Sequence, residues 1–398
     1  MIEEGGITRN EFMERIRKCI SQMERSNLDV LLVYGNSVRP ENLIYLTNYR
    51  PIGNDQPGSC AFPEYPAFFI LTRSGEATII IDRKWYVDWV KEESWVEDVK
   101  VARQGMLLEL TYETLRKRKL NTGRIGIEIG FFPANFYLQF RKTFFGAKIA
   151  EQYNVVSKLR ETKSPKELEL ISKGLQILGK AHKVAFSMGK EGVKETDIAQ
   201  AIRSVEYEEG VEYPTATYVD AGCRSTIALA NPMASNYRLK QGDMVLISLF
   251  CTYKKYSAGM DRCWVVGEPT QKQKKLAEIE LKGLLKAISL VKPGMKAADF
   301  NKQVYSDYVE PLLKEANINA YDIGGYVGHG TGLGTVEAPI LWPLDQTTLK
   351  AGMVIDIEPG IYIKDPKIGG MRTAEFVVVS DMGCKVMSKD CSRRMGWE

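Results

Sequence analysis

Only two histidines occur in the chain, and they stand in different settings. His329 lies between glycines in a loop of small residues, GHGTGLG, whereas His182 lies in a helical pattern between Lys180 and Lys183. Because the reference pKa of an imidazole is close to neutral, His329 is a candidate general base or substrate ligand. The structural alternative is a hydrogen-bonding role between two strands. His182 is expected to lie at the surface.

Two carboxylates stand close together in the segment GMVIDIEPGIYI. Asp356 and Glu358 are two residues apart, and side chains with this spacing share one face of a strand, about 6–7 Å from each other. A strand here therefore directs both carboxylates into the same cleft.

The elements that must position these residues fall into two domains. In the first, residues 1–158, helical and strand-like patterns alternate, which predicts a mixed α/β domain. The segment 67–82 indicates a hairpin, because two apolar runs flank a Ser-Gly turn. The pattern predicts helices over 8–26, 84–92 and 108–118, and further strands over 30–35, 43–49 and 124–130.

The second domain, residues 159–398, begins at a clear helix start. Ser164 is placed as an N-cap, Pro165 stands at the first helical position, and Glu167 completes a capping box. Two helix pairs and two strand-rich units then alternate along the chain. This order predicts a duplicated αβ half with internal pseudo-two-fold symmetry.

Composition excludes several classes of protein. The chain has 398 residues, 44% of them hydrophobic and 26% charged, so it should form two packed domains. The 54 basic and 50 acidic residues are mixed and form no basic stripe, which disfavours nucleic-acid binding. No apolar run reaches the roughly 20 residues that span a bilayer, and the N-terminus lacks a signal-peptide core. Seven scattered cysteines suggest free thiols, so a cytoplasmic location is expected.

Short motifs identify a family by their order along the chain. They read LRETKSPKELELI, VKPGMKAADF, KQGDMVLI, DRCWVVGEP, GHGTGLG, EAP, LKAGMVIDIEPGIY and GGMR. On these motifs residues 160–390 resemble the pita-bread domain of aminopeptidase P, prolidase, methionine aminopeptidase and creatinase. The preceding part resembles the creatinase/prolidase N-terminal domain. The resemblance implies an α/β (α+β) protein with these two domains, which forms a homodimer.

The resemblance also shows where the chain departs from the metallopeptidases of this family. Those enzymes hold two metal ions with two Asp, one His and two Glu, and the ions activate a water for attack on an amide. The matching positions here are Ser248, Gly259, His329, Glu358 and Ala374. Three of the five ligands are therefore absent, and the metal site is expected to be dismantled.

A rewired site is the alternative. Asp261 is two residues past Gly259, and Asp356 is two before Glu358, so both carboxylates should point into the same cleft. Together with His329 and Glu358 they form a set of four that is chemically suited to one divalent metal such as Mn, Co or Zn.

The metal-free reading follows the creatinase branch. Creatinase also lacks both Asp ligands, has a catalytic glutamate where this chain has Asp261, and keeps the residues that match His329 and Glu358. One feature differs, because the proton-shuttling histidine of creatinase corresponds to Ala230. The further histidine of the peptidases corresponds to Val336.

Other residues enter as substrate contacts or as structure. Arg262 matches a family arginine and is expected to be structural. By the resemblance, Glu358 and Asp261 face each other across the cleft, where two nearby carboxylates can divide acid and base work or hold a cationic guanidinium or ammonium group. The structural alternative for this pair is a strand-packing network around Arg262. Arg372 should pair with Glu358 or with a substrate carboxylate, and Tyr256 should line the pocket or belong to the core. By the resemblance, the loop YRPIGNDQPG reaches the partner's active site, so Arg50, Asn54 and Asp55 are candidate substrate contacts. The alternative is an ordinary surface loop.

The sequence therefore predicts a hydrolase that cleaves a C–N bond of a small polar nitrogen compound, without metal or other cofactor. His329, Glu358 and Asp261 would be its catalytic residues. One alternative is an Xaa-Pro dipeptidase or aminopeptidase with the rewired metal site. Another is a catalytically inactive pita-bread protein that binds peptides or proteins. The expected partners are a small-molecule substrate and a second copy of the chain, with no nucleic acid and no membrane.

Overall fold

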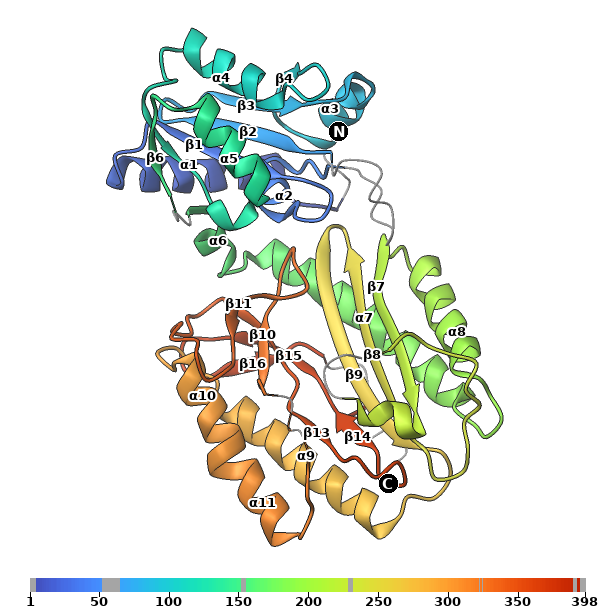
Figure 1. The fold of residues 1–398 in the computed structure, drawn as a ribbon. Helices are drawn as coiled ribbons and strands as arrows, with labels where there is room; N and C mark the ends of the chain where they lie inside the picture. Colours follow the sequence, from blue (N-terminus) through green and yellow to red (C-terminus); the bar gives the residue numbers. More distant parts are fainter. Residues whose placement is uncertain are drawn as a thin grey trace. The chain divides into compact units, whose positions relative to one another are not determined.

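The structure is a computed structural model that describes residues 5–51, 65–151, 155–227, 232–321, 323, 325–388 and 392–393. The chain divides into two compact units, Met1–Arg160 and Glu161–Glu398 (Figure 1). This division falls two residues after the predicted boundary, because helix α6 (Val155–Arg160) belongs to the first unit. Across the described ranges, no helix has both the length and the apolar character that a bilayer crossing requires.

The first unit is built on one mixed sheet with the strand order β4-β3-β2-β1-β5-β6. β1 and β2 pair antiparallel, as do β2 and β3, while the outer pairs of the sheet are parallel. The strands are β1 Val30–Gly35, β2 Ala67–Thr72, β3 Ala77–Ile81, β4 Asp98–Val101, β5 Arg124–Gly126 and β6 Lys148–Ala150. The helices are α1 Arg9–Arg25, α2 Glu41–Thr47, η1 Lys84–Tyr86, α3 Val87–Glu93, α4 Leu107–Lys117, η2 Ile129–Phe131, α5 Ala134–Thr143 and α6.

One predicted element of the first unit is wrong. The segment 43–49 was expected to be a strand, but Glu41–Thr47 is helix α2. Every residue from Asn42 to Thr47 is buried, so the helix has no exposed polar face and shows no helical alternation. A short buried helix of this kind cannot be told from a buried strand by periodicity. The hairpin over 67–82, by contrast, is confirmed by the pairing of β2 with β3.

The second unit opens with a helix pair and an antiparallel sheet. α7 (Pro165–Met188) begins at the predicted capping box, in which Ser164 and Glu167 exchange side-chain and backbone hydrogen bonds. α8 (Glu195–Glu208) follows, and the sheet has the order β7-β8-β9. Its strands are β7 Tyr213–Ala221, β8 Met244–Tyr253 and β9 Tyr256–Val265, and the short helix η3 Gly222–Thr226 follows β7.

The second half of this unit repeats the order of helices followed by strands (Figure 1). One sheet has the order β11-β10-β12-β15-β16, and β13 pairs with β14 alone. The helices are α9 Gln271–Leu290, α10 Ala297–Val304, the π-helical segment η4 Tyr305–Val309, and α11 Glu310–Glu315. The strands are β10 Gly328–Gly330, β11 Glu337–Ile340, β12 Val354–Ile357, β13 Gly360–Tyr362, β14 Gly370–Arg372, β15 Glu375–Val379 and β16 Cys384–Val386.

Candidate metal centre

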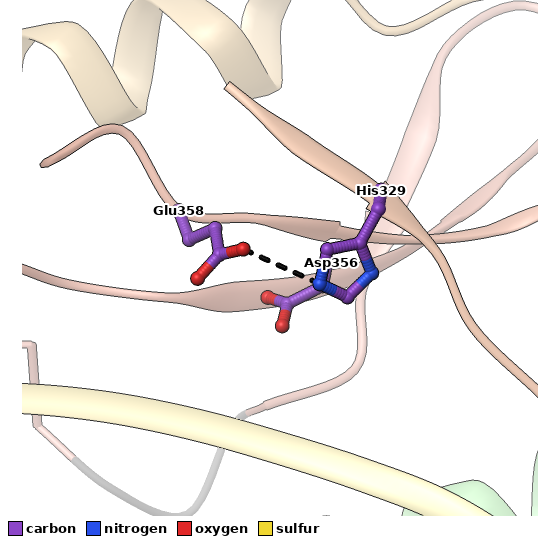
Figure 2. Close-up of side chains that lie close together, drawn as sticks. All are labelled: His329, Asp356 and Glu358. Carbon is purple, nitrogen blue, oxygen red and sulfur yellow. Dashed lines mark ion pairs between the residues drawn. The ribbon is translucent and has the colours of Figure 1, made fainter. Parts of the chain in front are cut away.

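Three side chains converge at the centre of the second sheet. His329 on β10 is the cross-strand partner of Asp356 on β12, and Glu358 follows β12 directly. One ligand atom from each of the three lies within 4.8 Å of the others, and all three residues are buried. Figure 2 shows the carboxylates of Asp356 and Glu358 turned toward the imidazole ring. We call these three residues the donor cluster.

The close approach of the two strands depends on a glycine. A Cβ atom at Gly328 would lie 1.9 Å from the carbonyl oxygen of Asp356, which no side chain permits. The backbone N–H of Glu358 also donates to the carbonyl of Val327, at 2.8 Å. The Gly-His-Gly sequence therefore brings β10 close enough for His329 to meet both carboxylates.

The imidazole of His329 is held at both ring nitrogens. Nδ1 lies 3.0 Å from the carbonyl oxygen of Gly330, to which it donates, and Nε2 lies 3.3 Å from Oε1 of Glu358. Burial alone would lower the pKa of His329, but the hydrogen bond and charge of Glu358, with Asp356 nearby, raise it to about 9. These two carboxylates therefore favour the protonated form of the imidazole.

The two carboxyl groups of the donor cluster differ strongly in hydrogen bonding and in the direction of their pKa shifts. Both oxygens of Asp356 are buried and make no hydrogen bond among the described residues. Burial, followed by the charge of Glu358, raises the pKa of Asp356 well above its usual value. Burial also acts to raise the pKa of Glu358, but Arg372 and His329 outweigh it and lower the value to about 2. A buried carboxyl without partners is costly, and a cation beside Asp356 would remove that cost.

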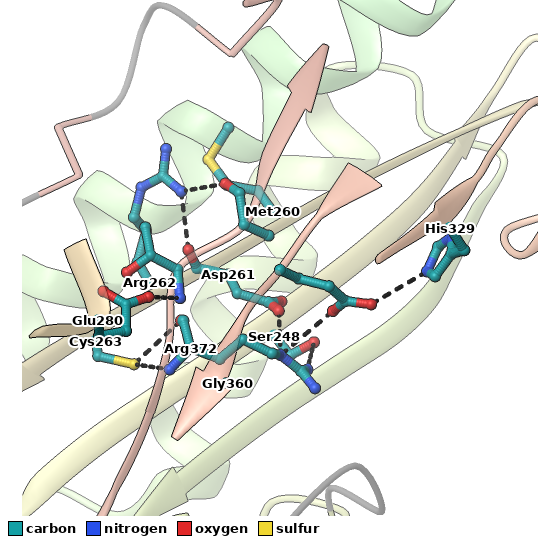
Figure 3. A network of polar contacts seen from close by, with 12 residues as sticks. Ser248, Met260, Asp261, Arg262, Cys263, Glu280, His329, Gly360 and Arg372 are labelled. Carbon is teal, nitrogen blue, oxygen red and sulfur yellow. Dashed lines mark hydrogen bonds and ion pairs between the residues drawn. The ribbon is translucent and has the colours of Figure 1, made fainter. Parts of the chain in front are cut away.

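A second set of side chains surrounds Arg372, at the end of β14. Its Nε contacts Oδ2 of Asp261 and lies 3.4 Å from Oε2 of Glu358. Its Nη2 donates to Oγ of Ser248 at 3.0 Å, and its Nη1 lies 3.4 Å from the hydroxyl of Tyr362. We call Arg372, Asp261, Ser248 and Tyr362 the arginine network, and Figure 3 shows the first three of these residues together.

The predicted catalytic residues thus divide between the two sets. The structure brings His329 and Glu358 together with Asp356, as the rewired alternative required. Asp261 does not join them, because its carboxylate contacts Arg372. Burial raises the pKa of Asp261 to about 6, with Arg372 acting against it. Of the predicted set of four donors, three converge and the fourth pairs with an arginine.

The predicted substrate contacts lie in several places. Arg372 pairs with Glu358, one of the two partners expected for it. The hydroxyl of Tyr256 donates to Oε1 of Glu167 at 3.0 Å, so this group is satisfied within the core. Arg50 is half-buried in the first unit. Asn54 and Asp55, like Ala230, lie outside the described residues.

The prediction for His182 is wrong, and that for Arg262 is confirmed. His182 is fully buried on α7, and its Nε2 lies 2.9 Å from the carbonyl oxygen of Met260 on β9. The flanking lysines pointed to the surface, but the ring lies on the helix face that packs on the sheet. Arg262 is fully buried, and its Nη2 lies 3.1 Å from Oε1 of Glu375, which is a structural role.

Several residues of the site escaped sequence reasoning. Tyr326 hydrogen-bonds Glu358, and Tyr362 contacts Arg372. Glu280 on α9 accepts from the backbone N–H of Thr373 at 2.7 Å, and burial raises its pKa to about 7. Tyr362 stands four residues after Glu358 in the motif IEPGIY, which was a usable signal. Glu280 lies in a helix outside every motif that the sequence analysis identified.

The donor set fits a divalent cation. One imidazole and two carboxylates suit Mn, Co or Zn, and three protein ligands leave open positions for water or substrate. The unpartnered oxygens of Asp356 are the groups that such an ion would satisfy. The residues present therefore match the chemistry of a single metal ion.

The fold and this centre define a class, the two-domain hydrolases with a pita-bread domain. The chain belongs to metallopeptidase family M24, whose sequence profile matches residues 169–381. Residues 15–162 match the creatinase/prolidase N-terminal domain. The predicted family, fold class and hydrolase class are therefore confirmed.

Known relatives cover nearly the whole chain. It is 31% identical over 377 residues to an Xaa-Pro dipeptidase of Pyrococcus furiosus, which spans 94% of this chain and 98% of that protein. An Xaa-Pro dipeptidase of Pyrococcus horikoshii is 30% identical over 381 residues, 94% of this chain and 97% of the relative. The crystal structure of a prolidase from Pyrococcus horikoshii superimposes with a TM-score of 0.79 at 29% identity, covering 96% of this chain and 99% of the other.

These relatives bear on the cofactor. Membership of a metallopeptidase family favours a divalent metal and does not support the expectation that no cofactor is needed. The geometry of the donor cluster also favours a divalent metal, since the cluster offers the ion three suitable donor atoms.

Proposed function

We propose that this protein hydrolyses the amide bond of Xaa-Pro dipeptides with one divalent cation held by His329, Asp356 and Glu358. A single observation carries the proposal: three buried donor side chains converge within 4.8 Å, and one of them, Asp356, has no hydrogen-bond partner among the described residues. The relatives named Xaa-Pro dipeptidases supply the substrate class.

Each residue of the cluster has a distinct part. Gly330 accepts from Nδ1 of His329 and so turns Nε2 toward the two carboxylates, as outer hydrogen bonds do at metal sites. Tyr326 and Arg372 fix the carboxylate of Glu358 from the other side. Asp356 and Nε2 of His329 lose their protons when they become ligands, so metal binding is coupled to proton release. When bound, a divalent cation polarises the amide carbonyl and lowers the pKa of water.

The metal-free C–N hydrolase is the weaker candidate. It is favoured by the loss of ligands at Ser248, Gly259 and Ala374. It needs a base, however, and Glu358 favours the protonated form of His329, which is not basic. Asp261, the third predicted catalytic residue, contacts Arg372 and so is not free to hold a substrate cation.

The test compares metal-free and metal-loaded protein on a defined panel. Purified protein is stripped with a chelator, and hydrolysis of Leu-Pro is followed after adding Mn, Co or Zn. We expect no turnover before addition and turnover after it, with Leu-Ala as the control dipeptide. Turnover that survives complete metal removal would support the metal-free hydrolase. Metal binding without turnover of dipeptides, amides or amidines would support the inactive binding protein.

A further inference from the structure

One position that has lost a metal ligand contacts Arg372, and the other two are linked to it through Asp261. Ser248 on β8 receives a hydrogen bond from Nη2 of Arg372, at 3.0 Å. Gly259 stands two residues before Asp261 on β9, and Asp261 is the cross-strand partner of Ser248. Ala374 stands two residues after Arg372, and its backbone N–H donates to the carbonyl of Asp261. The three missing side chains therefore belong to one region of the site.

An apolar ring fills part of the room that a ligand at Gly259 would need. Phe250 is the cross-strand partner of Gly259 in the β8–β9 hairpin. A Cβ atom at Gly259 would lie 2.3 Å from Cε1 of the Phe250 ring. Even the first atom of an aspartate side chain is therefore excluded unless the ring moves.

The remaining carboxylates of this region are already matched by a positive charge. Arg372 is almost fully buried, and its Nε faces both Oδ2 of Asp261 and Oε2 of Glu358. Glu358 is shared between the two sets, because its other oxygen, Oε1, faces His329. A guanidinium beside two buried carboxylates supplies the charge that a metal ion would otherwise bring.

We infer that Arg372 acts as a resident cation in place of a second metal ion, so that the site takes one divalent ion and not two. This inference rests on the proposed function for the first ion at the donor cluster. Asp261 then has the role of holding the guanidinium in place. Arg372 is a positioning residue for Glu358, which it fixes from the side opposite His329.

The number of bound ions tests this directly. Mn²⁺ is counted per chain by equilibrium dialysis and elemental analysis in the wild type, Arg372→Ala and Arg372→Lys. We expect one ion in the wild type and two in Arg372→Ala, where Ser248, Asp261 and Glu358 lose their guanidinium. Arg372→Lys keeps a cation and should bind one ion. The double variant Arg372→Ala/Asp261→Asn should again bind one ion per chain, because the second ion would lose the Asp261 carboxylate.

Each pattern of counts separates the inference from the proposed function. Two ions in the wild type, or one in both wild type and Arg372→Ala, overturn the inference and leave the proposed function standing. None in the wild type and one in Arg372→Ala supports the role of Arg372 and contradicts the proposed function. None in either contradicts both. Circular dichroism of each variant verifies folding, and added guanidinium at millimolar concentration should displace the extra ion only in Arg372→Ala.

Discussion

Asp356 lies directly opposite His329 across the antiparallel pair β10–β12. Cross-strand partners have their Cβ atoms about 4.5–5.5 Å apart, so this register places a carboxylate beside the imidazole without help from any loop. Glu358, two residues further along, completes the cluster from the same chain segment. A single carboxylate at position 356 thus gives the site a third donor where the ligands expected from the family are missing.

Replacement of His329 should abolish metal binding and activity. Loss of residues that merely orient a metal ligand typically lowers affinity about 10–100-fold, so loss of the ligand itself should cost more than about 100-fold. His329→Gln keeps a polar side chain of similar size. Titration with Mn²⁺ and Leu-Pro hydrolysis measure the two effects. Equal affinity in the variant and the wild type would remove His329 from the site.

A methyl group at position 328 should open the site. Gly328→Ala places Cβ against the carbonyl of Asp356, so β10 and β12 must separate. Overpacking of this kind costs about 1–3 kcal/mol, and the same separation should weaken metal binding. Gly130→Ala is the matched control, since a Cβ there meets nothing within 4 Å. Urea denaturation and Mn²⁺ titration of both variants measure the outcome, and similar values for the two would contradict the role of Gly328.

The buried pair of Arg262 and Glu375 should contribute to stability and not to catalysis. Both side chains are fully buried, and Arg262→Met leaves the carboxylate of Glu375 without this partner. Breaking a buried pair from one side costs about 3–5 kcal/mol. The double variant Arg262→Met/Glu375→Leu should recover part of this loss. Thermal unfolding provides the measurement, with Lys282→Met, at an exposed ion pair, as the control expected to leave Tm unchanged. A single variant as stable as the wild type would refute the assignment.

Stability should fall as pH rises through the titration of Glu206. Both carboxylate oxygens of Glu206 are buried without hydrogen-bond partners in the described chain, and burial raises its pKa to about 8. Between pH 4.5 and 8 the folded state therefore binds more protons than the unfolded state, so the free energy of unfolding decreases with pH. The total decrease is at most about 5 kcal/mol. Glu206→Gln should flatten the curve of Tm against pH in this window, and an unchanged curve would contradict it.

Local signals allowed much of the fold to be predicted. The capping box at Ser164 and the hairpin over 67–82 depend on residues close in sequence, and both are confirmed. Helix α2 was missed because it is buried on every side and has no alternation to read. His182 was misplaced because neighbouring lysines do not fix which side of a helix is packed.

The site was predicted only in part for a similar reason. Asp356 and Glu358 share a face by their spacing, which the sequence states directly. The direction of the Asp261 side chain depends on Arg372, which is more than a hundred positions away in the chain. The Phe250 ring beside Gly259 depends in turn on the register of the β8–β9 hairpin. Such contacts follow from the packed arrangement and not from a local pattern.

The most direct test of the account is a Mn²⁺ titration of Asp356→Asn beside Glu206→Gln. Both replace a buried carboxyl that has no hydrogen-bond partner among the described residues by an amide, but only Asp356 belongs to the donor cluster. The account predicts that Asp356→Asn lowers the Mn²⁺ affinity by more than about 100-fold, while Glu206→Gln binds one ion as the wild type does. Equal Mn²⁺ affinity in Asp356→Asn and the wild type would contradict the account.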